Sequence, residues 1–250
     1  MCEVTALFPP DQDVPGCLAL AFDSIGLKEM LQYKLSEVQH QNWEQQIKDL
    51  FQPCQVSDKL WIVPHWSSPP DVSATNVILD PGLAFGTGDH PTTRLCLCWL
   101  SNVIQGGEMI LDYGTGSGIL AIAGLKLGAS NAVGVDIDPV AVSSAAHNAS
   151  LNGYEENSLR VFLAPSLEND FFPEIDAEYD IVVANLLLNP LLSLSKHLLA
   201  YIKPNGLLGL SGILESQVDE VQKIYGIHLD NINVTVQDGW ACFSGRKSMV

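Results

Sequence analysis

The chain has 250 residues, of which 47% are hydrophobic and 16% charged, and its formal net charge at pH 7 is −17. This composition is typical of a packed globular protein rather than a disordered one, and no apolar run approaches the roughly 20 residues that cross a bilayer. A sequence-independent grip on nucleic acid depends on clustered Lys and Arg. The acidity therefore argues against direct nucleic-acid binding and favours a basic protein partner.

The cysteines indicate a reducing, intracellular compartment. The six of them include no C-x-x-C pair, and a chain of this size does not need disulfides to be stable. Cys96 and Cys98 lie two residues apart on a predicted helix and so face different ways, and we expect no metal site. The start of the chain matches neither a secretory signal nor a transit peptide, and the choice between cytoplasm, mitochondrion and chloroplast stays open.

Residues 1–70 are predicted to form a small, partial α+β unit followed by a linker. Glu44 to Phe51 has the pattern of a helix, and Lys59 to Val63 that of a short strand ending at Pro64. The stretch HWSSPPDVSATN is rich in Ser and Pro, which is typical of a linker, and we place the domain boundary within it. The main domain is then residues 71–250.

The segment DPGLAFGTGDHPTTRLCLCWL is a glycine-rich loop that leads into a predicted helix with Pro91 at its first position. Because the loop precedes the main sheet, it is placed to cover a ligand. Thr92 and Thr93 are candidates either to cap this helix or to donate hydroxyl groups to the ligand. His90 is titratable near neutrality, but a lone histidine in a loop is more often structural than catalytic.

From Gly107 onward, strand-like and helix-like segments alternate. This alternation predicts an α/β fold with a doubly wound parallel sheet, which binds ligands at the carboxyl ends of its strands. The predicted strands are 109–113, 132–136, 159–163, 180–185 and 206–212, and the predicted helical segments are 119–128, 139–153, 190–202 and 214–225.

The motif LDYGTGSGILAIAG gives the strongest local indication of a ligand. It takes a predicted strand into Gly114, Gly116 and Gly118 and then into a helix. Glycines let the backbone turn tightly and approach a ligand closely, with the helix N-terminus behind them. Dinucleotide-binding enzymes and purely structural turns show similar patterns, so the loop alone does not identify the ligand.

Two acidic residues follow the next predicted strand. Asp136 ends that strand 22 residues after Gly114, where an acidic side chain accepts hydrogen bonds from ribose hydroxyls. Asp138 stands before Pro139 and is expected to cap the following helix. Asp136 is therefore the candidate ribose ligand of an adenosine-type cofactor.

Asn185 ends the run DIVVAN at the same edge of the predicted sheet. Enzymes that methylate the amino groups of bases follow such an Asn or Asp with Pro-Pro and an aromatic residue, whereas here three leucines follow. An aliphatic amine is therefore a better substrate prediction than a flat base.

The end of the chain predicts an antiparallel hairpin. INVTVQ and WACFSG are strand-like and are separated by Asp238 and Gly239, a pair favoured in hairpin turns. Dinucleotide-binding domains finish on parallel strands, whereas the methyltransferase variant of the fold inserts an antiparallel last strand. The hairpin therefore favours the methyltransferase variant.

With these segments, the chain closely resembles the PrmA-type methyltransferases, which modify protein eleven of the large ribosomal subunit. The resemblance runs from NWEQQIKDLFQP and LWIVPHW through the loop and glycine motifs to VVANLL and GLLGLSGILESQ. It implies a class I, Rossmann-like fold, S-adenosylmethionine as the cofactor, and methylation of lysine side chains or an α-amine of a ribosomal protein. The cofactor ligands of the family fall on Thr93, Gly114, Asp136 and Asn185, and we add Phe85, Gly116 and Gly118 as close neighbours.

Asn185 is also the catalytic candidate, because its side-chain oxygen is placed to orient the incoming amine. Two departures from the family leave these ligands intact: Asp89 stands where bacterial members usually have Thr, and Tyr113-Gly114-Thr115 replaces Phe-Gly-Cys. Residues 1–70 are expected to retain only the later part of the family's substrate-recruiting domain.

Two other interpretations stay open. A nicotinamide-dependent oxidoreductase is supported by the glycine loop and Asp136, but the C-terminal hairpin argues against it. A non-catalytic adaptor that keeps the methyltransferase fold is suggested by the shortened N-terminal unit and by Asp89.

Overall fold

The chain forms two compact units, Met1–Asp49 and Leu50–Val250. The described part of the first unit contains the helix α1 (Val14–Ser24). The helix predicted from Glu44 to Phe51 lies outside the described residues, except for Phe51, which is not helical. The computed structural model describes residues 8–9, 12–24, 26, 33–35, 51–82, 85–164 and 178–249.

The larger unit begins with a three-stranded sheet in the order β1-β2-β3. The strand β1 (Cys54–Ser57) is antiparallel to β2 (Leu60–Pro64), and β2 is parallel to β3 (Thr75–Leu79). The predicted strand ending at Pro64 is therefore confirmed.

The boundary between the units lies at Asp49 and Leu50, earlier in the chain than the boundary expected near residue 70. Leu60 and Ile62 of β2 are buried in one hydrophobic cluster with residues of the main-domain helices. The Ser- and Pro-rich stretch connects β2 to its partner β3, so it is a loop within the larger unit. The recruiting role assigned to residues 1–70 stays a prediction.

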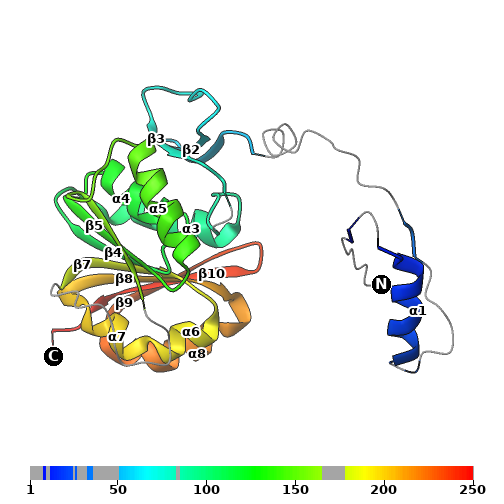
Figure 1. The fold of residues 1–250 in the computed structure, drawn as a ribbon. Helices are drawn as coiled ribbons and strands as arrows, with labels where there is room; N and C mark the ends of the chain where they lie inside the picture. The colour runs from blue at the N-terminus through cyan, green and yellow to red at the C-terminus, as the bar shows by residue number, and fades with distance from the viewer. Residues whose placement is uncertain are drawn as a thin grey trace. The chain divides into compact units, whose positions relative to one another are not determined.

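The main sheet has seven strands in the order β6-β5-β4-β7-β8-β10-β9 (Figure 1). The first five of these strands are parallel, and β10 is antiparallel to both β8 and β9. The predicted α/β fold and its antiparallel C-terminal hairpin are confirmed. The strands are β4 (Met109–Tyr113), β5 (Asn131–Asp136), β6 (Leu159–Leu163), β7 (Tyr179–Asn185), β8 (Ile202–Leu214), β9 (Leu229–Gln237) and β10 (Trp240–Lys247).

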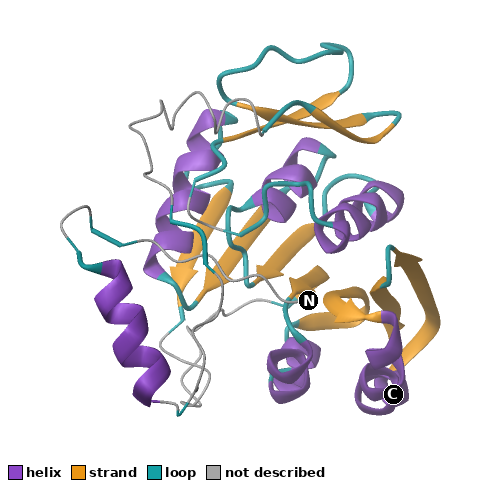
Figure 2. Ribbon diagram, turned by 90° about the vertical axis from the view of Figure 1, so that its right-hand side faces the viewer, coloured by secondary structure: helices purple, strands orange, loops and turns teal. Residues whose placement is uncertain are grey.

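Helices cover both faces of this sheet (Figures 1 and 2). One face carries α3 (Pro91–Val103), α4 (Ile119–Lys126) and α5 (Pro139–Leu151). The other carries α6 (Leu188–Ser193), α7 (Ser195–Ala200) and α8 (Val218–Tyr225). The single helical segment predicted over 190–202 is thus divided between α6 and α7.

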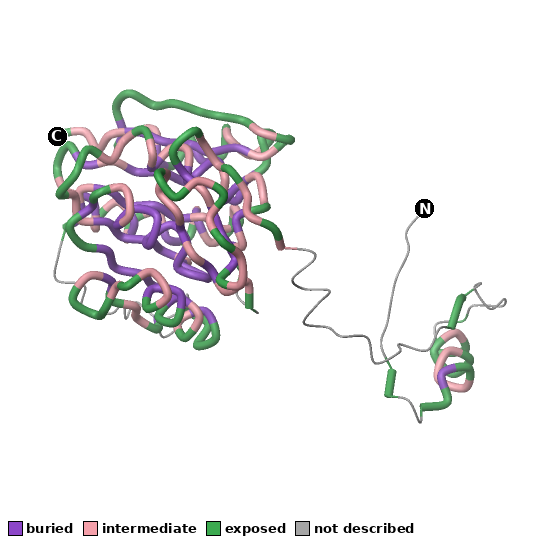
Figure 3. Tube along the Cα trace, turned by 90° about the horizontal axis from the view of Figure 1, so that it is seen from above, coloured by how far each residue is buried: buried purple, intermediate pink, exposed green. Residues whose placement is uncertain are grey.

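The core of the larger unit lies on both faces of the central strands, and its buried segments lie inside a more exposed outer layer (Figure 3). Successive residues of a strand point to opposite faces, so Ile110 of β4 joins the cluster under α3 and α4, while Leu111 joins the cluster under α6 to α8. Burial on both faces explains why the central strands are apolar throughout.

A glycine positions α3 on the sheet. Gly209 of β8 lies directly beneath the ring of Trp99, and a Cβ atom on residue 209 would overlap that ring. Glycine therefore lets the helix approach the strand closely. This contact matters for the site, because the first turn of α3 carries Thr92 and Thr93.

We expect Gly209→Ala to lower the free energy of unfolding by about 1–3 kcal/mol, because the added methyl group forces α3 away from β8. Gly82→Ala is the matched control, since nothing lies within 4 Å of its Cβ position. Its expected effect is within about 0.5 kcal/mol. Denaturant unfolding followed by circular dichroism measures both, and equal stabilities for the two variants would contradict this packing role.

Candidate functional site

A cavity of about 370 Å³ lies at the carboxyl ends of the parallel strands. Ligands bind at this edge in open α/β sheets. The cavity contains five of the predicted site residues, together with residues from the loop before α3 and from the ends of β8 and β10. It is lined by Phe85, His90, Thr92, Gly114, Gly116, Asp136, Asn185, Leu186, Leu187, Gly212 and Trp240.

The glycine turn after β4 is held against the end of β5. The backbone N–H groups of Gly114 and Thr115 both donate to the carbonyl oxygen of Val135, at 2.7 and 3.0 Å. Gly114 has a φ of 79°, in the left-handed region that favours glycine. Its Cα faces Leu186, whose side chain occupies the space that a Cβ atom would need. The turn is therefore specific for glycine.

The buried side chain of Asp112 supports this turn through hydrogen bonds. Asp112 Oδ2 accepts hydrogen bonds from Thr115 Oγ1 at 2.8 Å and from the Ala121 N–H at 3.2 Å. Asp112 is fully buried, and its Oδ1 has no hydrogen-bond partner among the described residues. Burial disfavours the charged form and raises the pKa of this carboxyl from 3.8 to about 7.

Asp138 is a helix cap and Asp136 lines the cavity. Asp138 accepts a hydrogen bond from the Val140 N–H at 2.8 Å and caps α5, which confirms that prediction. Asp136 accepts from the Gly116 N–H at 2.9 Å and from the Asp138 N–H at 3.0 Å, one on each oxygen. Each carboxylate oxygen keeps a further lone pair for a ligand.

Asn185 lines the cavity at the end of β7, and its side chain is held by Thr93. The Asn185 amide Nδ2 donates to Thr93 Oγ1 at 3.4 Å, while its Oδ1 is buried and has no partner among the described residues. A buried acceptor without a partner costs roughly 1–3 kcal/mol. Such a cost is typical of a group that awaits a ligand.

Two predicted residues do not line the cavity. Thr93 is only 1% exposed, and its hydroxyl group contacts the Asn185 amide. Its predicted contact with a cofactor therefore stays a prediction. Gly118 is the N-cap of α4, with a φ of 81°, and packs against Ala145 of α5.

The loop before α3 is tied to the glycine turn. The Ser117 N–H donates to the Phe85 carbonyl at 2.9 Å, and Ser117 Oγ donates to the Gly86 carbonyl at 2.6 Å. These bonds hold Phe85 at the mouth of the cavity, where its side chain is 61% exposed. A loop fixed in this way covers one side of the site, as predicted.

His90, rather than a threonine, caps α3. Its Nδ1 accepts from the Thr92 N–H at 3.3 Å and lies 2.7 Å from Thr92 Oγ1. Pro91 follows at the first helical position, as predicted. The His90 ring also packs edge-on against Trp240, with ring centroids 4.8 Å apart. The histidine is therefore both a structural cap and part of the cavity wall.

The sequence did not single out Trp240 or Gly212 for the site. Trp240 begins β10 directly after the Asp238-Gly239 turn, and Gly212, with a φ of 86°, lies against the Leu186 backbone. The hairpin turn that predicted β10 also fixes where Trp240 stands. The turn does not predict that β10 also pairs with β8, and this pairing brings Trp240 to the cavity.

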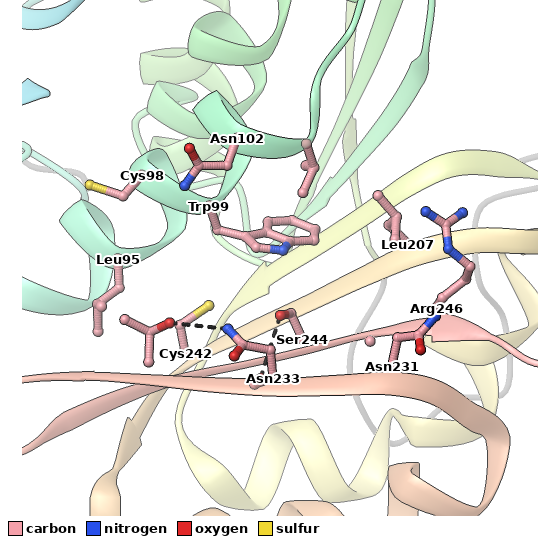
Figure 4. Close-up of a pocket in the computed structure, with 13 residues that line it drawn as sticks. Leu95, Cys98, Trp99, Asn102, Leu207, Asn231, Asn233, Cys242, Ser244 and Arg246 are labelled. Carbon is pink, nitrogen blue, oxygen red and sulfur yellow. Dashed lines mark hydrogen bonds between the residues drawn. The ribbon is translucent and has the colours of Figure 1, made fainter. Parts of the chain in front are cut away.

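A second cavity of about 400 Å³ lies between α3 and the strands β8, β9 and β10 (Figure 4). Trp99 and Asn102 extend into it from α3, and Asn233 and Arg246 from the strands. None of the described residues that line it is Asp, Glu or His, and none ends a parallel strand at the carboxyl edge. We therefore take the first cavity as the functional site.

In the described ranges, no group of three or more His, Cys, Asp or Glu side chains is placed to hold a metal ion. Cys96 is buried, while Cys98 faces the Val56 carbonyl, so the two point in different directions, as predicted. No helix in the described part of the chain is both long and apolar enough to cross a membrane.

Comparison with known proteins identifies the family. Residues 1–248 match the family model described as ribosomal protein L11 methyltransferase (PrmA). The chain belongs to this family. Ribosomal protein L11 methyltransferases from Dechloromonas aromatica and Nitrosomonas europaea are 46% and 43% identical to it, each over 98% of this chain and 79% of the relative. The predictions of this family and of a methyltransferase are confirmed.

Solved structures agree with the fold. A ribosomal protein L11 methylase from Lactobacillus delbrueckii subsp. bulgaricus superposes with a TM-score of 0.70 at 29% identity, covering 79% of this chain and all of that chain. The 16S rRNA N2 G1207 methyltransferase of T. thermophilus, solved with AdoMet and guanosine, gives a TM-score of 0.53 at 20% identity over 66% of this chain and 45% of that chain. The second likeness concerns the fold alone.

The raised pKa of Asp112 predicts a pH-dependent stability. With a folded pKa of about 7, Asp112 keeps its proton where an unfolded carboxyl with a pKa of 3.8 has lost it. The folded state then binds more protons, so this group's contribution to stability falls as pH rises from about 4 to 7.

Asp112→Asn removes this titration. The stability of the variant relative to the parent should therefore rise between pH 4 and pH 7, by up to about 4 kcal/mol, and stay level above pH 8. Paired urea titrations at several pH values measure the difference, in which the titration of other groups cancels. A difference that does not vary with pH would show that the Asp112 carboxyl has the same pKa in the folded and unfolded states.

Proposed function

We propose that this protein transfers methyl groups from S-adenosylmethionine to amino groups of ribosomal protein L11, on lysine side chains or on the α-amine. The proposal rests chiefly on Asn185, which lines the strand-end cavity together with Asp136 and whose buried Oδ1 has no partner among the described residues. The family match supports L11 as the substrate.

The residues of the cavity fit the cofactor. Asp136 has free lone pairs for the ribose hydroxyls. Gly114 and Gly116 carry no side chains, so a ligand can approach the backbone beside Asp136 closely. A Cβ atom on residue 116 would meet the Phe85 carbonyl, so the narrow space here suits only glycine. Bound there, S-adenosylmethionine supplies an electrophilic methyl group on a positively charged sulfur. Thr93 acts by holding the Asn185 amide in place.

Asn185 orients the acceptor. An amine attacks the methyl group through its lone pair, so one of its N–H groups is free to donate to Asn185 Oδ1 while the lone pair points at the methyl carbon. This bond fixes the line of attack and satisfies the buried oxygen. As the amine nitrogen gains the methyl group, the bond between methyl carbon and sulfur would break and the sulfur would keep the electron pair as a neutral thioether. The methylated ammonium would then lose its extra proton to solvent.

The amine must first lose its proton, since a lysine side chain has a pKa near 10.4 in water. Asp136 is the only carboxylate among the described residues that line the cavity, and Leu186 and Leu187 make part of the wall apolar. An apolar wall favours the neutral amine. We assign no dedicated general base.

Neither alternative interpretation is favoured. An oxidoreductase does not account for the antiparallel β10 or for the family match. An adaptor gives no reason to keep a buried Asn185 oxygen that has no partner among the described residues. The absence of direct nucleic-acid binding and the reducing compartment stay predictions.

Incubation of the protein with S-adenosylmethionine carrying a labelled methyl group and purified L11 tests the function. We expect label on L11, and peptide mapping by mass spectrometry then separates lysine from α-amine acceptors. Asn185→Ala should lower kcat about tenfold, because the lost hydrogen bond of about 1.5 kcal/mol orients the amine. Parent-like turnover by this variant would remove Asn185 from the mechanism, and an unlabelled L11 would reject the substrate.

Asp136 is tested by cofactor binding alone. Asp136→Ala removes the acceptor for the ribose hydroxyls and should weaken S-adenosylhomocysteine binding at least tenfold by calorimetric titration, since a charged hydrogen bond contributes about 1.5–3 kcal/mol. Asp138→Asn is the matched control, because asparagine also caps a helix well, and its affinity should stay within twofold. Equal losses in both variants would argue against a ribose contact specific to Asp136.

A further inference from the structure

Three aromatic rings form one side of the cavity. Phe85 and His90 have ring centroids 5.8 Å apart, His90 and Trp240 have centroids 4.8 Å apart, and both pairs meet edge to face. We call Phe85, His90 and Trp240 the aromatic wall. We propose that this wall binds the side chain that carries the acceptor amine, so that Trp240 and His90 set the affinity for the protein substrate. The inference rests on the function proposed above.

The order of the strands places the part of the wall made by Trp240 and His90 on the acceptor side, while Phe85 lies nearer the glycine turn. Along the carboxyl edge, Asp136 ends β5, Gly114 follows β4, Asn185 ends β7, Gly212 lies on β8 and Trp240 begins β10. Neighbouring strands are about 4.8 Å apart, so the four steps from β5 to β10 span about 19 Å.

A cofactor whose ribose lies at Asp136 and whose methyl group reaches Asn185 uses the first two of these steps. The remaining part of the cavity, over β8 and β10, is then left for the methyl acceptor. Trp240 and His90 line that part.

The chemistry of the wall suits an aliphatic ammonium that must become neutral. Ring faces attract a cation within about 6 Å of the ring centroid, and they also pack against the methylene groups of a lysine side chain. A carboxylate in the same place would pair with the ammonium and favour its charged form. Asp136, the one carboxylate among the described lining residues, lies at the opposite end of the cavity. The aromatic wall therefore attracts the ammonium group of the substrate, and no carboxylate beside it favours the charged form of that group.

His90 contributes a ring surface rather than a base. The Thr92 N–H donates to His90 Nδ1, so this nitrogen is engaged in the cap of α3 and the ring is presented to the cavity as part of its wall.

The mouth of the cavity shows apolar side chains that a substrate would cover. Phe85 is 61% exposed and Leu187 is 68% exposed, and they come from the loop before α3 and from the segment after β7. Large exposed apolar side chains at a cavity mouth are typical of a contact surface. An extended polypeptide that inserts one side chain along the aromatic wall would bury both.

The test measures methyl transfer to L11 and binding of S-adenosylhomocysteine for a set of variants. Trp240→Ala should raise the KM for L11 at least tenfold and leave the Kd for S-adenosylhomocysteine within twofold, whereas Trp240→Phe, which keeps a ring, should stay within threefold of the parent in both. His90→Asn keeps a good helix cap but lacks the ring, so it should raise the KM severalfold and leave the pH dependence of kcat as in the parent. Ile227→Ala, at a 78% exposed position in a different part of the larger unit, is the surface control.

The outcomes separate the claims. An unchanged KM in Trp240→Ala overturns the inference while the function stands. A Kd for S-adenosylhomocysteine that rises in parallel with KM moves Trp240 into the cofactor site and also overturns it. Loss of a limb of the pH profile in His90→Asn makes His90 a base rather than a wall residue. A parent protein that labels no L11 overturns the proposed function and the inference together.

Discussion

The turn after β4 depends on the end of β5. Two N–H groups of the turn share the Val135 carbonyl, and the Gly116 N–H binds Asp136. The same carboxylate is the candidate ribose ligand, so the bond that shapes the glycine turn also fixes the orientation of that ligand. Because β4 and β5 are parallel neighbours, their carboxyl ends lie at the same edge of the sheet. The turn after β4 and the end of β5 are therefore in direct contact. The remainder of the site is arranged along that edge.

The supports of the site come from the face of the sheet that carries α3 and α4. Asp112 holds the turn through Thr115 and the first residues of α4, and the loop carrying Phe85 holds it through Ser117. Thr93 belongs to α3, whose approach to β8 depends on Gly209, and it fixes the Asn185 amide. The polar atoms aimed at the ligand are therefore held by packing and by bonds that lie outside the cavity. Such preorganisation is what an in-line methyl transfer requires.

Local patterns in the sequence were enough for much of this arrangement. The glycine turn, the cap at Asp138 and the hairpin at Asp238-Gly239 each follow from a few adjacent residues, and each was predicted. Thr93 and Asn185 were candidates from their own positions, and the family resemblance assigned both to the cofactor. The structure brings them together although they lie far apart in the chain.

Features that depend on tertiary contacts were not predicted. Trp240 reaches the cavity only because β10 lies beside β8, and strand order cannot be read from a strand's own pattern. The position of the unit boundary failed for a similar reason: the strand ending at Pro64 is buried by helices that come later in the chain. Thr93 contacts Asn185 but does not line the cavity, because its side of α3 is buried. The spacing of residues in the sequence does not predict that burial.

The most direct test of this account is a crystal structure of the protein with S-adenosylhomocysteine. The account predicts one bound molecule, with its ribose hydroxyls within hydrogen-bond distance of Asp136, its sulfur facing Asn185, and the space beside Trp240 left open. Density for the ligand between α3 and β9, or a ribose far from Asp136, would contradict it.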